Sequence, residues 1–156
     1  KKAYDSGDFP TAISKYEEAI AAETDPEKKA SYMFSKASIQ FRKLKKYSKA
    51  RATALEAAKL RPTWGRPIML IGDMYGSSAR NCGDDWNQRL AIIAAIDKYN
   101  YAKSIDASVA EEASSRVSKY RASLPEQAEG FMRSKKAGDS AKVGCWIGET
   151  VKVRFK

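Results

Sequence analysis

The segment SYMFSKASIQFRKLKKYSKARATALEAAKLRPTW, residues 31–64, carries the clearest structural signal in the chain. Its first half places Phe34, Ala37 and Phe41 three and four residues apart, which puts all three on one face of a helix. Its second half contains another apolar face, built mainly of alanine, and ends at Pro62, which cannot continue a helix. The segment therefore predicts two helices that pack against each other.

Small residues recur at one fixed spacing in three separate segments. Each segment has two alanines seven residues apart, which places both on one stripe of a helix, two turns apart. Alanine at such positions lets the backbone of another helix approach closely. We therefore expect stacked helical hairpins, a repetitive scaffold rather than a compact enzyme fold. The three segments are Ala12-x3-Tyr16-x2-Ala19, Ala50-x3-Ala54-x2-Ala57 and Ala95-x3-Tyr99-x2-Ala102.

These segments resemble the tetratricopeptide repeat. In that repeat a first helix carries Leu-Gly and then Tyr, and a second helix carries Ala-x3-Phe/Tyr-x2-Ala before a proline. The unit from Ser31 to Trp64 is similar over its whole length, although Ala37-Ser38 replaces Leu-Gly and Ala54 replaces the aromatic residue. The next unit has Ile71-Gly72 but lacks the closing proline. The resemblance implies an all-α tetratricopeptide-type solenoid of helical hairpins, an α-α superhelix.

The resemblance also divides the chain into repeats and a C-terminal cap. It implies a partial repeat at residues 1–26, a repeat at 27–64, a repeat with an insertion at 65–107, and a cap at 108–156. The chain opens with Lys-Lys rather than Met, so we expect it to be the C-terminal part of a longer protein. Its tail resembles the ends of a group of bacterial repeat proteins.

The cap is predicted to consist of one helix and a small β-hairpin. Ser108 and Glu111 have the spacing of a capping box, which begins a helix. Farther on, Gly148-Glu149 is predicted to be a two-residue turn between strands at 143–147 and 150–155. An isolated hairpin is marginal in water, so we expect it to pack on the last helices.

The composition argues against an active site. The chain has no histidine, which removes the commonest general base and the commonest metal ligand. Two cysteines cannot form a four-thiolate zinc site, and no Gly-rich phosphate-binding motif occurs. We therefore expect a chain that is not an enzyme and has neither a cofactor nor a metal site. It has no run of 18 apolar residues, so no membrane span is expected.

The function that the resemblance implies is noncatalytic protein–protein scaffolding, in which a concave groove binds an extended or helical segment of a protein or peptide partner. In the family, the first helix of each hairpin lines this groove. The alternative is that this short face binds nothing and that the last unit only caps a longer array. Carried over residue by residue, the exposed groove positions are Tyr32, Ser35, Ile39, Arg42, Lys43, Arg66, Met69, Asp73 and Ser77.

A second hypothesis concerns the strongly basic segment from Lys28 to Arg66. It holds twelve lysines and arginines against one acidic residue, Glu56, in a chain whose net charge is +10. Such a surface suits nucleic acid or another anionic surface. The alternative is that these cations are the ordinary solvated faces of two helices.

The two cysteines also leave two alternatives open. Cys82 lies in the predicted insertion and Cys145 in the predicted tail. A disulfide between them would indicate an oxidising compartment, such as the bacterial cell envelope or periplasm. Otherwise they are two unrelated thiols in a reduced cytosol.

Overall fold

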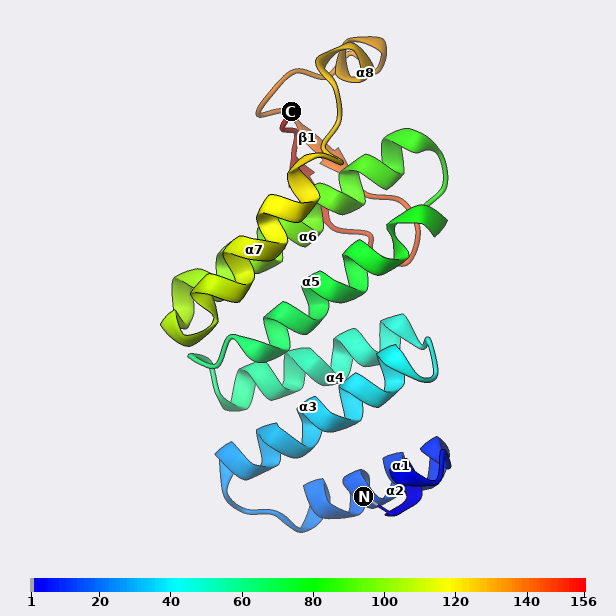
Figure 1. Cartoon of the computed structure of the whole chain (residues 1–156), viewed down its shortest axis with the longest axis vertical. Helices are drawn as coiled ribbons and strands as arrows, with labels where there is room; N and C mark the ends of the chain where they lie inside the picture. Colours follow the sequence, from blue (N-terminus) through cyan, green and yellow to red (C-terminus); the bar gives the residue numbers. More distant parts are fainter. Residues whose placement is uncertain (1) are drawn as a thin grey trace.

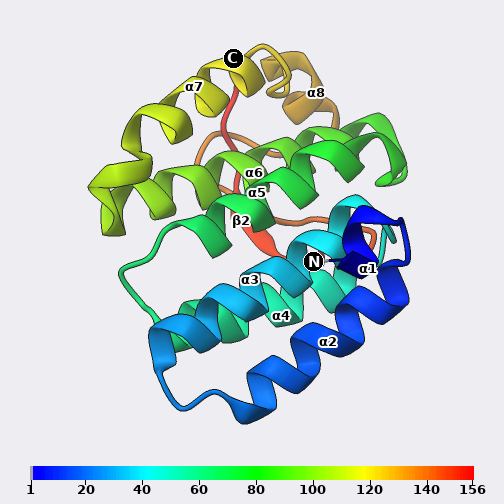
Figure 2. The same cartoon turned by 60° about the horizontal axis from the view of Figure 1, so that its bottom comes forward.

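The structure, a computed structural model, describes residues 2–156 and is mostly helical (Figure 1). The elements are α1 (Lys2–Asp5), α2 (Phe9–Ala22), α3 (Pro26–Arg42), α4 (Tyr47–Leu60), α5 (Arg66–Ser78), α6 (Asp85–Ile105), α7 (Ala110–Arg121), α8 (Gln127–Met132), β1 (Ser140–Lys142) and β2 (Thr150–Lys152). From α2 to α7 each helix packs against the next one in the chain (Figure 2). The prediction of a mainly helical chain that ends in a small antiparallel sheet is thus confirmed.

Aspartate residues cap the starts of α2, α3 and α6. Asp25 precedes Pro26, and its carboxylate accepts a hydrogen bond from the N–H of Glu27 at 3.1 Å. Asp84 caps the start of α6 in the same way. These side chains satisfy N–H groups that have no partner within the helix, which fixes where each helix begins.

The recurring small-residue stripe lies at helix contacts in the second and third segments. All six of its positions there are fully shielded from solvent. In the first segment Ala12 is buried, whereas Ala19 is half-buried because α2 lies at the end of the stack and has a neighbour on fewer sides (Figure 1). The fully shielded positions are Ala50, Ala54, Ala57, Ala95, Tyr99 and Ala102.

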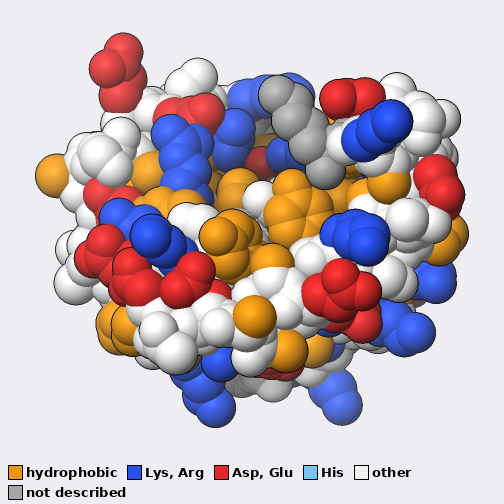
Figure 3. Space-filling view, turned by 90° about the horizontal axis from the view of Figure 1, so that it is seen from below, with side chains coloured by type: hydrophobic (Ala, Val, Ile, Leu, Met, Phe, Trp, Pro, Cys, Tyr) orange, Lys and Arg blue, Asp and Glu red, His pale blue; other side chains and the backbone are white. Residues whose placement is uncertain are grey.

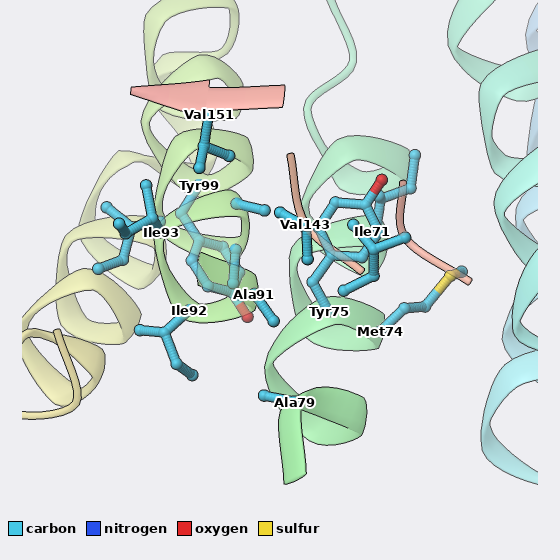
Figure 4. Packing of buried hydrophobic residues seen from close by; sticks show 14 of the residues in the cluster. Ile71, Met74, Tyr75, Ala79, Ala91, Ile92, Ile93, Tyr99, Val143 and Val151 are labelled. Atoms are coloured by element: carbon cyan, nitrogen blue, oxygen red, sulfur yellow. The ribbon is translucent and has the colours of Figure 1, made fainter. Parts of the chain in front are cut away.

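The main hydrophobic core lies between α5, α6 and the C-terminal tail. Figure 4 shows Val143 and Val151 of the tail pointing toward the side chains of these two helices, as expected for a hairpin that packs on the last helices. Gly72 of α5 faces the ring of Tyr99 on α6, and a Cβ atom there would lie 2.7 Å from a ring carbon. Glycine is therefore required for α5 and α6 to approach this closely.

Cys82 and Cys145 form a disulfide, so they are not two unrelated thiols. Their Cα atoms are 5.0 Å apart, and 63 positions separate them in the sequence. Cys82 is buried just after a single 3₁₀ turn at Ala79–Asn81, and Cys145 lies exposed in the tail. The bridge therefore ties the tail covalently to the insertion between α5 and α6.

The prediction of a two-residue hairpin turn is wrong. The paired strands are Ser140–Lys142 and Thr150–Lys152, so the connection covers residues 143–149. The first strand thus precedes the predicted one at 143–147, and the second ends sooner than predicted. Backbone pairing continues into the connection only through the N–H of Val143, which bonds the carbonyl oxygen of Glu149 at 2.8 Å.

The long connection follows from an arginine on a distant helix. Arg51 of α4 donates hydrogen bonds to the carbonyl oxygens of Trp146 at 3.2 Å and Ile147 at 2.7 Å, which holds this part of the connection against α4 rather than against the other strand. The same guanidinium donates to the hydroxyl of Tyr75, which in turn donates to Glu149. Burial and the hydrogen bond to Glu149 raise the pKa of Tyr75, which keeps it a neutral donor.

The prediction that Ser108 and Glu111 form a capping box is also wrong. Asp106 occupies the capping position instead, and its carboxylate accepts hydrogen bonds from the N–H and the hydroxyl of Ser108 at 3.0 and 2.6 Å. The same carboxylate accepts the N–H of Gly65 at 2.7 Å. Asp106 therefore joins the turn before α5 to the turn before α7. The hydrogen bonds from Ser108 and Gly65 lower its pKa.

Asp106→Ala is expected to lower the free energy of unfolding by about 2 kcal/mol, because it leaves the N–H of Gly65 without its charged acceptor. Ser108→Ala, which keeps that acceptor, should have a smaller effect in the same urea titration. Since folding lowers the pKa of Asp106, its contribution is present above the ordinary aspartate pKa and is lost as the pH falls through the lower, folded-state value. Equal stability of the two variants at pH 7 would contradict this role of Asp106.

Candidate protein-interaction surface

Three helices that are not consecutive in the chain place charged side chains on one common side of the molecule. Asp73 of α5 forms ion pairs with Arg42 of α3 at 3.3 Å and with Arg116 of α7 at 3.2 Å. Glu112 of α7 pairs with Arg116 at 3.2 Å and with Arg66 at the start of α5. We call the surface on which these five residues lie the α3–α5–α7 face.

Asp73 is the centre of this network and is itself largely shielded. Its side chain is 17% exposed, and the hydroxyl of Tyr99 donates to it at 2.6 Å. Burial, and then the charge of Asp73, raise the pKa of Tyr99, so that the phenol remains a neutral donor. Because Asp73 receives bonds from a phenol and two arginines, it positions those arginines rather than offering an acceptor to solvent.

The arginines of the face remain accessible. The side chains of Arg42, Arg66 and Arg116 are 54%, 42% and 30% exposed, and only two carboxylates balance their three charges. Each guanidinium has five N–H donors in a planar fork, of which the ion pairs use a part. The remaining donors suit carboxylate or carbonyl groups of a bound segment.

An apolar hollow adjoins this network at the N-terminal end of the molecule. It has a volume of about 340 Å³, and Arg42 lies at its edge, so the hollow and the ion-pair network are continuous. Figure 3 looks at this end and shows hydrophobic side chains gathered near its middle, with charges of both signs around them. The hollow is lined by Tyr4, Asp5, Tyr16, Phe34, Ser35, Ser38, Ile39, Arg42 and Lys43.

Lys43 is held over the aromatic part of this hollow. Its ammonium group lies 5.9 Å from the ring centre of Tyr4 and 5.8 Å from that of Phe9. A cation over an aromatic face is attracted by the ring quadrupole. The hollow therefore combines apolar walls with two cations, Arg42 and Lys43, at its rim.

The sequence-predicted groove residues fall into three groups. Ser35, Ile39, Arg42 and Lys43 line the hollow, while Arg66 and Asp73 belong to the ion-pair network. Tyr32 is half-buried and Ser77 is exposed, and both lie outside the hollow and the network. Met69 also lies outside the hollow and the network.

Two of these positions are not exposed as predicted. Met69 is 2% exposed and lies in the main core, so its assignment to the open groove is wrong. The reason is that α5 packs against both α4 and α6 and has little free surface. Ile39 is 4% exposed and contributes only to the wall of the hollow.

Sequence reasoning missed Glu112 and Arg116, because the helix that carries them was interpreted only as a cap. Their separation of four residues is the spacing of an ion pair on one helix face. This signal could have marked α7 as part of the surface.

The basic segment is partly used within the fold. Lys36, Arg42 and Arg66 form ion pairs with carboxylates, and Arg51 holds the tail. In the part of the chain that the structure describes, Lys45, Lys46 and Lys49 have no ion pair. They lie exposed around the turn between α3 and α4.

Comparison of the chain with protein-family models, curated proteins and solved structures finds no match in any of the three. Within residues 2–156 no group of three or more potential metal ligands comes together. None of the helices described there is long and apolar enough to cross a membrane.

Proposed function

We propose that this chain is a noncatalytic protein-interaction scaffold of the tetratricopeptide class, which binds a segment of a partner protein on the α3–α5–α7 face. The observation that carries the proposal is the position of Arg42, which belongs both to the apolar hollow and to the row of ion pairs across α3, α5 and α7. This face corresponds to the groove that the resemblance implies, with the last helices as its continuation.

The chemistry of the face defines the kind of segment that fits. The hollow, with about 340 Å³ and walls that include Tyr16 and Phe34, accepts one large apolar side chain. Arg42 and Lys43 at its rim favour a carboxylate next to that side chain. The accessible arginines farther along bind main-chain carbonyls or further carboxylates. We therefore expect the face to bind a short segment in which an aromatic or aliphatic side chain stands beside an acidic residue.

A peptide selection tests this proposal. Random peptides displayed on phage are selected for binding to the chain. The affinity of the selected peptides for the parent chain is then compared with their affinity for two variants. Ser35→Trp, which fills the hollow, should weaken binding at least tenfold by removing the site of the apolar anchor. Ala52→Trp, an exposed position on α4 outside the face, should leave it unchanged. Peptides that bind both variants as well as they bind the parent chain would contradict the assignment of the face.

A second candidate function is the binding of nucleic acid or another polyanion by the basic segment. Lys45, Lys46 and Lys49 favour it, because they are exposed and form no ion pair with any residue from 2 to 156. Salt separates the two functions in the same titrations. Binding through phosphates weakens by orders of magnitude between about 50 and 200 mM salt, whereas binding through an apolar anchor changes little.

The disulfide supports a compartment in which thiols are oxidised, and the bacterial cell envelope or periplasm is our proposal for it. In this proposal α7, α8 and the tail are the cap of the stacked helices.

A further inference from the structure

The most exposed large hydrophobic side chains lie together at one tip of the molecule, far from the proposed groove. Phe131 and Met132, at the end of α8, are 85% and 83% exposed. Figure 1 shows α8 at the end of the long axis opposite to α1 and α2. Two adjacent hydrophobic side chains with nearly all of their surface in water mark an interaction site.

The tip is built to present these side chains outward. Gly130 packs its backbone against the ring of Phe155, where a Cβ atom would overlap the ring. Beyond the helix, the N–H groups of Ser134 and Lys135 bond the carbonyl oxygens of Phe131 and Gly130 at 3.1 and 2.8 Å. With the backbone fixed on this side, Phe131 and Met132 face solvent in an ordered turn rather than in a frayed end.

Basic residues follow the apolar pair in the sequence. From Phe131 to Lys142 the chain has four lysines and arginines and one acidic residue, Asp139. The acidic neighbours are partly engaged, since Glu126 pairs with Lys156 at 2.8 Å and Asp84 with Arg133 at 3.0 Å. Lys135 and Lys136 line the same small surface hollow as Phe131. Within residues 2–156 neither of them forms an ion pair, so these two are the cations that the tip offers beside its apolar pair.

This combination suits a membrane surface better than a protein. A stable protein interface buries about 800 Å² on each partner and needs complementary shape, whereas this tip offers two side chains on a protrusion. A fluid bilayer needs no such complementarity: apolar side chains enter its interface, and cations nearby are attracted to anionic headgroups. We propose that the α8 tip docks this chain peripherally on anionic lipid bilayers, with Phe131 and Met132 inserted and Lys135 and Lys136 at the headgroups.

Vesicle flotation tests the proposal, with phosphatidylcholine vesicles and vesicles that also contain one quarter phosphatidylglycerol. We expect binding to the anionic vesicles, reduced about tenfold or more by Phe131→Ser with Met132→Ser, because apolar insertion is lost. Lys135→Gln with Lys136→Gln should reduce it by about fivefold for each cation removed, on anionic vesicles only. As a matched control, Leu55→Ser with Tyr101→Ser removes two exposed hydrophobic residues elsewhere and should change nothing.

Three results would overturn this assignment. The first is absence of binding to either kind of vesicle. The second is binding that survives the Phe131 and Met132 changes but is lost on Lys45→Gln with Lys46→Gln, which would move the contact to the α3–α4 turn. The third is a concentration-dependent dimer in light scattering that the Phe131 and Met132 changes abolish, which would make the tip a contact between two copies.

Discussion

Replacement of Cys82 and Cys145 by serine is expected to lower the free energy of unfolding by about 4 kcal/mol. The bridge closes a loop across 63 positions of the chain. In the chain-entropy model, a cross-link over a loop of this length lowers the conformational entropy of the unfolded chain, which raises the free energy of unfolding by about 4 kcal/mol. Because the folded chain keeps its other tail contacts, such as the hydrogen bonds from Arg51, the variant should fold and unfold at lower denaturant concentration.

Urea titrations of the parent chain, the reduced parent chain and the double variant measure this effect. The last two should agree, because both lack the bridge. Intact-mass analysis supplies the control, since reduction of the bridged chain adds two hydrogens. A parent chain whose midpoint does not move on complete reduction would show that the bridge adds nothing to stability. A parent chain whose mass does not change on reduction would show that the bridge is absent and would remove the support for an oxidising compartment.

The second large effect is expected for Ala50→Trp. Ala50 is fully shielded where α4 meets its neighbours, so an indole there must displace neighbouring helices, at a cost of at least about 1–3 kcal/mol. Ala52→Trp is the matched control, because it places the same side chain on the exposed side of the same helix. Thermal unfolding followed by circular dichroism compares the two. If both variants melted with the parent chain, the stripe of small residues would not be a helix contact.

The sequence predicted most of the helical framework, because its signals there are local or repeat at short range. The i, i+3, i+7 spacing of Phe34, Ala37 and Phe41 depends on residues that are close in the sequence. The alanine stripe at Ala50 and Ala95 is a repeated local pattern, and its burial in α4 and α6 follows from stacking of like helices.

What the sequence did not predict depends on contacts between distant residues. The tail connection is set by Arg51, which is 95 and 96 positions from the carbonyl groups that it binds. The turn that leads into α7 is capped by Asp106, whose carboxylate also accepts the N–H of Gly65. Met69 lies where an open groove is expected, and it is buried because α5 has a neighbour on either side. No local pattern in the sequence predicts the contacts of Arg51, the contacts of Asp106 or the burial of Met69.

The attachment of the tail to α4 changes the order in which the stacked helices can unfold. In a simple repeat array each unit contacts only its neighbours, so the terminal units can peel away one at a time. Here Arg51 of α4 forms hydrogen bonds with the tail, and the disulfide links the same tail to Cys82, just after α5. α4, α5 and the tail are therefore each held to the other two. Unravelling is left to start at the opposite end, at α1 and α2, which also form one border of the hollow that a partner would enter.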